Sequence, residues 1–278
     1  MLSFSIWSLI EAVSIWLTVW VDAFIVGYFL NEYYLGIYRT STSMVNGLLG
    51  MVTAATTPVL FSALSRLQNN ESQFNQLFFK FQRSVALLLF PLGIGVFLYS
   101  DVATKILLGN QWEEASDVIG IWALTSVIMI VYGHYCSEVY RAKGRPKLSF
   151  IAQLVHLIFL VPICSLSAKY GFWVLVIARS LSRLQMIVVH WIIMRFIIKI
   201  SILRTVKNLL SVSIAAIAMG LLGFVLKTIH ESVLWSVVSI VLCIIFYICT
   251  LFIFPNTRTD LFTLSSKIIP QRPLASEK

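Results

Sequence analysis

Two carboxylates and two guanidiniums lie inside long apolar stretches of this sequence. Glu11 and Asp22 belong to "WSLIEAVSIWLTVWVDAFIVGYF", residues 7–29, and Arg179 and Arg183 belong to a second apolar run, residues 171–196. An ionised group near the centre of a bilayer costs about 2.5–3.5 kcal/mol on insertion scales, so each of these residues needs a partner, water or, for a carboxylate, a proton. Charged groups in such positions line ion or substrate pathways.

Smaller polar residues share helix faces with these charges. At 100° per residue, an arc of about 120° on the first helix contains Ser8, Glu11, Ser14, Thr18 and Asp22. A second stripe, at spacings of four and three residues, contains Arg39, Ser43, Asn46, Gly50, Thr53 and Thr57. Such faces either pack closely against other helices through their small polar residues or line a wet cavity. For Asp22, a structural ion pair with Arg39 across the first loop is a further alternative.

Two further sets of charged or titratable residues each have two alternative roles. Arg179 and Arg183 are four residues apart on one face, and they either pair with Glu11 or Asp22 or line a cavity that receives phosphate, which guanidinium binds bidentately. A set with i, i+4, i+7 spacing near the cytoplasmic end of the fourth span contains His134, Glu138 and Arg141. We interpret this set as an interfacial polar network in preference to a proton relay.

Membrane-spanning helices must position these groups. The chain has 278 residues, of which 59% are hydrophobic and 12% charged, a balance that excludes a water-soluble domain. Apolar runs near the 20-residue length of a spanning helix occur at residues 3–30, 37–63, 81–108, 116–140, 147–168, 171–196, 207–226 and 233–254. They lack the period-two alternation of barrel strands, so we predict an all-α, polytopic membrane protein with about eight transmembrane helices.

The basic residues predict the orientation of these spans. The loops on one side, together with the tail, carry fifteen Lys and Arg, whereas the loops on the other side carry four. The positive-inside rule makes the richer side cytoplasmic, which places both termini in the cytoplasm. Residues 255–278 are more polar and read as a cytoplasmic tail.

Several function classes lack support. The net charge of +9 comes from residues between apolar runs, so no nucleic-acid partner is expected. The four cysteines have no metal-ligand spacing, and no phosphate-binding loop, HExxH or GxSxG motif is present. We therefore expect no enzyme activity, no metal and no cofactor.

Several short blocks occur in a characteristic order over about 130 residues. Five of them, at residues 22–27, 35–38, 58–67, 91–95 and 107–112, lie in "VDAFIVGYFLNEYYLGIYRTSTSMVNG", "TTPVLFSALSRLQNN" and "FPLGIGVFLYSDVATKILLGNQWEEASDVIGIWAL", and a sixth follows at residues 142–146. Their order resembles the polysaccharide and O-antigen flippases of the multidrug/oligosaccharidyl-lipid/polysaccharide exporter superfamily.

The resemblance implies an architecture and a mechanism. Members of that family have about fourteen helices, in two six-helix lobes and two auxiliary helices, and the blocks resemble the start of the second lobe. Residues 1–200 would then form a six-helix lobe and 201–254 two auxiliary helices, while the first lobe would be missing or supplied by a partner chain. The expected activity is flipping of a polyprenyl-diphosphate-linked oligosaccharide by alternating access in the bacterial inner membrane, among membrane lipids. The candidate cavity residues are Glu11, Asp22, Arg39, Asn46, Arg179 and Arg183.

The carboxylates among these residues leave one further question open, because they could bind a coupling H⁺ or Na⁺ instead of the head group. Other functions compete with the flippase reading. They are a multidrug exporter of the same superfamily, a membrane assembly partner or fragment without transport, and, ranked last because all loops are short, a polymerase or glycosyltransferase.

Overall fold

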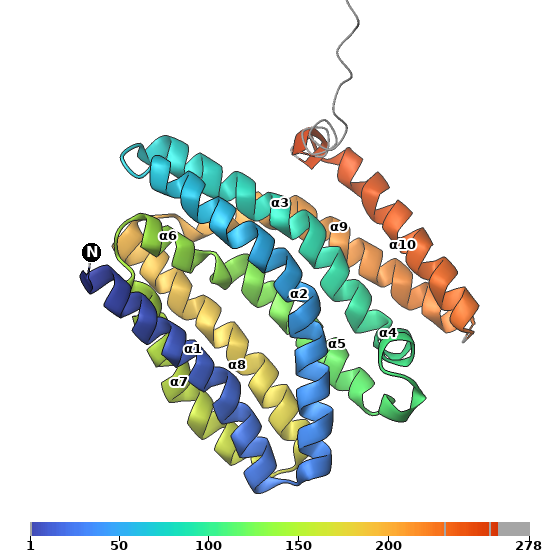
Figure 1. Cartoon of the computed structure of the whole chain (residues 1–278). Coiled ribbons are helices and arrows are strands. Elements are labelled where there is room, and N and C mark those ends of the chain that lie inside the picture. The colour runs from blue at the N-terminus through green and yellow to red at the C-terminus, as the bar shows by residue number, and fades with distance from the viewer. Residues whose placement is uncertain (1, 231, 256, 261–278) are drawn as a thin grey trace, which may run out of the picture.

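The computed structural model describes residues 2–230, 232–255 and 257–260, and every regular element within this part is a helix (Figure 1). Eight helical segments of the described part are long and apolar enough to cross a membrane. They are α1 (Leu2–Phe29), α2 (Glu32–Arg66), α3 (Glu71–Leu98), α5 (Ala115–Met129) with η2 (Ile130–His134) and α6 (Cys136–Ala142), α7 (Lys147–Ala168), α8 (Phe172–Ile193) with η3 (Met194–Ile198), α9 (Ile202–Ile229) and α10 (Val233–Ile253). The predicted fold class is confirmed.

The helices form one bundle in which α5 is central (Figure 1). It packs against α2, α3 and α8, while α7 joins α8 to α1. Helix α9 runs along α3, and α10 packs on α9 at the edge of the bundle. The division into a lobe at 1–200 and auxiliary helices at 201–254 stays a prediction. The predicted tail, residues 255–278, lies largely outside the described residues.

The third predicted span, 81–108, has the wrong limits. Helix α3 begins ten residues earlier, capped by the Asn70 side chain, which accepts a hydrogen bond from the Gln73 amide. It ends at Leu98 because Tyr99 leaves helical geometry with ψ of 33°, and a separate helix α4 (Ser100–Leu107) follows, then the single turn η1 (Asn110–Trp112). The start of α3 escaped a search for apolar runs because its first ten residues include Glu71, Ser72, Gln73, Asn75, Gln76 and Lys80.

The bundle has two ends. We call the end with the turns at 67–70, 143–146 and 199–201 the proximal end, because α1 starts there. The distal end holds the turns at 30–31, 108–114 and 169–171, together with the end of α9 and the start of α10. The Gly144 and Gly171 turns need positive φ, at 69° and 104°, a conformation that glycine adopts without steric cost.

Polarity is reversed relative to a soluble protein. Large apolar side chains cover the outside, as with Phe24 and Tyr28, which are more than 70% exposed, whereas Glu11 and Asp22 on the same helix are buried. The predicted polar stripe of α1 therefore faces inward from Glu11 to Asp22, since Ser14 and Thr18 are buried beside them; the side chain of Ser8, the first member of the stripe, lies outside the described part. This arrangement fits a bilayer, which solvates the apolar surface while the protein interior satisfies polar groups.

Candidate functional site

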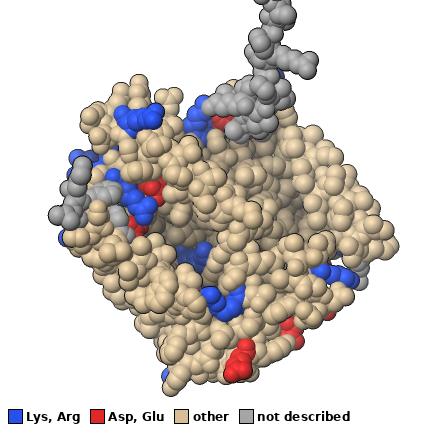
Figure 2. Space-filling model, in the orientation of Figure 1, with Lys and Arg blue, Asp and Glu red and all other residues tan. Residues whose placement is uncertain are grey.

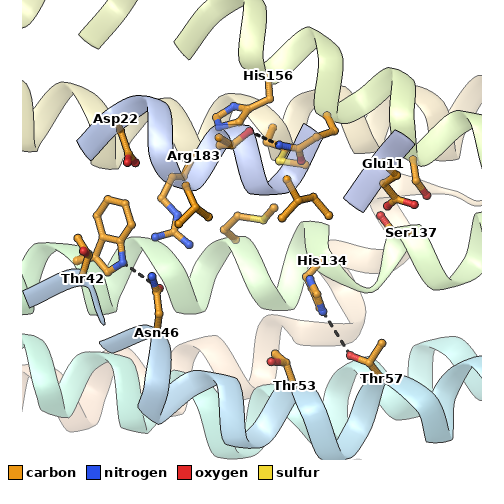
Figure 3. A pocket seen from close by; sticks show the side chains of 18 of the residues that line it. Glu11, Asp22, Thr42, Asn46, Thr53, Thr57, His134, Ser137, His156 and Arg183 are labelled. Atoms are coloured by element: carbon orange, nitrogen blue, oxygen red, sulfur yellow. Dashed lines mark hydrogen bonds between the residues drawn. The ribbon is translucent and has the colours of Figure 1, made fainter. Parts of the chain in front are cut away.

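A cavity of about 930 Å³ opens in the bundle between α1, α2, α5 to α6, α7 and α8. The face drawn in Figure 2 is hollowed near its centre, with Lys or Arg atoms visible in the hollow and charged atoms of both signs at its rim. All nine residues predicted as candidates from the sequence line this cavity, namely Glu11, Asp22, Arg39, Asn46, His134, Glu138, Arg141, Arg179 and Arg183. They fall into two clusters at opposite ends of the cavity, one around Asp22 and the other around Glu11 (Figure 3).

The distal cluster is built on Asp22 of α1. Its Oδ2 accepts hydrogen bonds from Arg179 Nε at 2.8 Å and from the Tyr38 hydroxyl at 2.9 Å. All three side chains are buried, and Arg179 also donates to the Ser182 hydroxyl. The carboxylate is thus matched by one guanidinium, and the alternative pairing with Arg39 is not formed.

Arg183, one turn further along α8, has no carboxylate partner among the described residues. Its guanidinium carbon lies 4.2 Å from the centre of the Trp122 ring, and Arg179 lies over the same ring at 5.2 Å. Arg183 Nη1 is buried without a hydrogen-bond partner among the described residues. Its side chain lies at the cavity, on the same side as Asn46 (Figure 3). The two arginines therefore differ, because Arg179 is an ion-pair partner and Arg183 is not.

Helix α2 lines the distal end of the cavity with residues that are themselves exposed. Arg39 stacks on the Trp20 ring of α1 at 4.8 Å, and Asn46 accepts a hydrogen bond from Trp122 Nε1 at 3.1 Å. Ser43, Asn46 and Gly47 are exposed although they line the cavity. The cavity is therefore open on the α2 side, and its distal end contains three arginines against one carboxylate.

The proximal cluster brings together residues from α1 and α6. Arg141 donates from Nη2 to Glu11 at 3.0 Å and from Nη1 to Glu138 at 2.8 Å. Both carboxylates are buried, with 2% and 3% exposure. Glu11 therefore joins the polar network predicted at this end and is far from Arg179 and Arg183, which the sequence had offered as partners.

A π-helical segment places the neighbouring histidine. The turn η2 interrupts the helix between α5 and α6, and π-turns are frequent at functional sites because they redirect side chains. His134 ends η2 and lies 3.3 Å from the Thr57 hydroxyl of α2, while the next residue, Tyr135, contacts Thr56 at 2.8 Å. These contacts tie α2 to the middle of the bundle (Figure 3).

Sequence reasoning missed several residues between the two clusters. Gln153 donates to Thr18 at 2.6 Å, and His156 lies 3.1 Å from Gln185. His190 contacts the Tyr140 hydroxyl at 3.1 Å. Both histidines line the cavity although neither was assigned a role. The sequence did contain one indication of these residues, because each is a polar residue within an apolar span. Trp122, whose ring lies beneath both arginines, gave no such indication. No group of three metal-binding side chains occurs among the described residues.

Comparisons with known proteins give a consistent picture. A family model described as "Polysaccharide biosynthesis protein" matches residues 1–117. The teichuronic acid biosynthesis protein TuaB of Bacillus subtilis (strain 168) is 24% identical over 254 residues, which cover 87% of this chain. An uncharacterized membrane protein in the cps region of Klebsiella pneumoniae is 21% identical over 170 residues, or 61% of this chain.

A solved structure shares the fold. The lipid II flippase MurJ in an inward closed conformation superimposes with a TM-score of 0.75 over 90% of this chain, at 16% identity. The chain covers 53% of the MurJ chain, 51% of TuaB and 35% of the Klebsiella protein, so it spans about half the length or less of these relatives. The family resemblance seen in the sequence is thus confirmed: this multi-pass membrane chain matches the polysaccharide biosynthesis family model over residues 1–117 and shares its fold with the flippase MurJ.

Proposed function

We propose that this chain supplies one half of a transporter that flips a polyprenyl-diphosphate-linked oligosaccharide across the bacterial cytoplasmic membrane. The observation that carries the proposal is the excess of positive charge at the distal end of the cavity. Three arginines face one carboxylate there, and Arg183 is not matched by any acid among the described residues. A diphosphate group provides the missing negative charge.

The geometry suits a phosphate ligand. The planar guanidinium of Arg183 is held on the Trp122 ring, which fixes its orientation without using its hydrogen-bond donors. Arg39 lines the same cavity from α2. Guanidinium groups bind phosphate oxygens through charge-assisted, bidentate hydrogen bonds.

The open α2 wall supports the transport part of the proposal. Polar and charged residues on a membrane-exposed side are costly unless they face water or protein. We infer that a second helical lobe, from the same polypeptide or a partner chain, covers this wall. The two lobes would rock about the cavity, so that the sugar head crosses inside while the polyprenyl tail stays in the lipid. Both termini of this chain would lie in the cytoplasm, as the loop charges predict.

The competing transporter function has less support. A multidrug exporter for cations would place unpaired carboxylates where the ligand binds. At the distal end the single carboxylate, Asp22, is neutralised by Arg179 and hydrogen-bonded by Tyr38. A membrane assembly partner without transport is the other alternative, and it would require no ligand at Arg183.

A binding experiment tests the proposal. The purified chain in lipid nanodiscs is titrated with inorganic pyrophosphate and with farnesyl diphosphate, followed by calorimetry. We expect the Arg183→Gln variant to bind at least tenfold more weakly, since a hydrogen bond to a charged group contributes about 1.5–3 kcal/mol. Arg66→Gln, which removes an exposed arginine outside the cavity, should bind like the wild type. Absence of binding by the wild type, or equal binding by Arg183→Gln, would contradict the proposal.

A further inference from the structure

A second, smaller cavity lies at the proximal end of the bundle. It has a volume of about 470 Å³ and lies between the first part of α1, the turn that joins α6 to α7, and η3. Its walls include the side chains of Trp7, Arg145, Lys147, Leu148 and Ile197. None of the residues that line it also lines the large cavity. A ligand bound here would therefore be separate from the diphosphate proposed above.

The charge of this smaller cavity is positive and uncompensated. Arg145 and Lys147 both line it, and both are exposed. Within the part of the chain that the structure describes, no acidic residue lines this cavity and no ion pair includes either cation. Glu11 and Glu138, two buried carboxylates at this end, are both bonded to Arg141. A ligand that complements the smaller cavity is therefore negatively charged.

The lining of the smaller cavity changes from charged to apolar. In α7, Lys147 is followed directly by Leu148, and η3 places Ile197 two residues before Lys199. Ile197 is 42% exposed, and Trp7 is half-buried beside Lys147. Tryptophan residues are enriched where a membrane meets water, because the indole ring is amphipathic. The smaller cavity therefore spans the boundary between lipid head groups and acyl chains.

The turn that carries Arg145 has a fixed backbone. Helix α6 ends in a Schellman motif, in which Gly144 adopts a φ of 69°. The Gly144 amide donates to the Arg141 carbonyl oxygen at 2.9 Å, and the Arg145 amide donates to that of Tyr140 at 2.8 Å. Pro146, which is buried, follows directly and restricts the backbone further. The base of the Arg145 side chain is thus held in place before any ligand binds.

The Lys147 side chain is positioned by an aromatic pair. Its ammonium nitrogen lies over the Trp7 ring, 5.2 Å from the ring centre, and this ring contacts Phe150 at a centroid distance of 5.5 Å. A lysine ammonium has three hydrogen-bond donors, and a contact with a ring face leaves the donors that point away from the ring free. Lys147 can therefore hold a phosphate oxygen while it remains on Trp7.

We propose that the smaller cavity binds the head group of an anionic phospholipid from the leaflet at the proximal end, which the loop charges predict to be cytoplasmic. The Arg145 guanidinium donates two parallel hydrogen bonds to phosphate oxygens, and Lys147 donates a third. Trp7 lies beside the glycerol esters, and the acyl chains pass along Leu148 and Ile197. The bound lipid joins α1, the α6–α7 turn and η3. This site does not depend on the proposed flipping function, because it lies outside the large cavity.

Native mass spectrometry of the purified chain in a neutral detergent tests the proposal. Phosphatidylglycerol and phosphatidylcholine are titrated separately, and the affinity of the first lipid bound is measured. We expect phosphatidylglycerol to bind at least tenfold more tightly, because each cation near the membrane surface favours an anionic lipid about fivefold. The double variant Arg145→Gln with Lys147→Gln should lose this preference. Equal affinity of the wild type for the two lipids would overturn the proposal.

Two control variants separate a defined site from general attraction. Arg66→Gln with Lys80→Gln removes the same charge from exposed positions of α2 and α3, and it should keep the preference for phosphatidylglycerol. An equal loss in the two double variants would show diffuse attraction and would overturn the site. Arg183→Gln should keep the preference as well. Its loss in that variant would place the lipid in the large cavity and would also overturn the proposal.

Two further ligands identify the source of the phosphate. Glycerol 3-phosphate has the charge but no acyl chains, so at equal concentration it should not displace phosphatidylglycerol. Displacement would assign the smaller cavity to a soluble phosphate ester and overturn the lipid site. Phosphatidylglycerol with a photoreactive diazirine near the ester carbonyl should label peptides that contain Trp7, Leu148 or Ile197. Labelling confined to other peptides would contradict the proposed placement.

Discussion

Arg179 Nε donates a 2.8 Å hydrogen bond to Asp22 Oδ2, an oxygen that also accepts from the Tyr38 hydroxyl. This links α1, α2 and α8 at the distal end of the cavity. Because Arg179 is satisfied in this way, its role is to hold the cavity wall together. Arg183, one turn away and without an acid partner among the described residues, remains available to a ligand.

Breaking this pair should destabilise the protein. Asp22→Asn leaves Arg179 buried without a counter-charge and should cost about 3–5 kcal/mol of unfolding free energy. The double variant Asp22→Asn with Arg179→Gln should lose clearly less than the sum of the two single variants. Asp101→Asn breaks a pair with Lys227 that is largely exposed and should cost under about 1 kcal/mol. Chemical unfolding in detergent measures all four; additive losses would show that the pair is not coupled.

Trp122 should matter for ligand affinity through the arginines on its ring. Its ring supports both Arg179 and Arg183, and cation–π contacts contribute about 0.5–2 kcal/mol. Trp122→Leu should therefore weaken pyrophosphate binding about fivefold or more, whereas Trp122→Phe, which keeps an aromatic ring, should retain most of it. Trp173→Leu, at a half-exposed position of α8, is the control. Equal affinity of Trp122→Leu and the wild type would show that the ring does not orient Arg183.

Close packing of α3 on α5 depends on one glycine. A Cβ added at Gly93 would lie 2.7 Å from Val127 Cγ2, and Val127 is a β-branched residue with little rotamer freedom. Gly93→Ala should thus cost about 1–3 kcal/mol through overpacking. Gly95→Ala, two residues along the same helix, meets nothing within 4 Å and should be neutral or slightly stabilising. Thermal unfolding of the two variants compares them directly; equal stability would refute the contact.

The orientation predicted from loop charges can be measured with single cysteines. Cys136, Cys164 and Cys243 are buried, so replacing Cys249 by Ser leaves a background without an exposed thiol. Asn69→Cys, in the turn between α2 and α3, should react with a membrane-impermeant maleimide only in inside-out vesicles. Tyr170→Cys, in the turn between α7 and α8, should react only in intact cells. The reverse pattern would place the termini outside.

The sequence predicted the helices and the polar face of α1 well, because both follow from local periodicity. Hydropathy is averaged over neighbouring residues along the chain, and a run of about 20 apolar residues is a strong indication of a spanning helix. The limits of α3 were wrong because its start is charged and its end depends on a backbone break at Tyr99. Such a break leaves no compositional trace.

Membership in the cavity could also be predicted, but pairing could not. Glu11 and Asp22 lie on one face of one helix, yet they pair with arginines that are 130 and 157 residues away. Which arginine meets which acid depends on helix order and tilt, which one sequence does not encode locally. For the same reason Trp122 and Tyr38 were overlooked, since an aromatic residue in an apolar span resembles ordinary packing until its partners are known.

Surface polysaccharide produced by cells that carry the complete transporter is the most direct test of the cavity arginines in flipping. Arg183→Gln should abolish the polysaccharide while the amount of protein in the membrane stays normal, because Arg183 has no carboxylate partner among the described residues and is proposed to bind the ligand. Arg66→Gln should leave polysaccharide unchanged. Normal polysaccharide from Arg183→Gln cells would contradict a diphosphate site at Arg183.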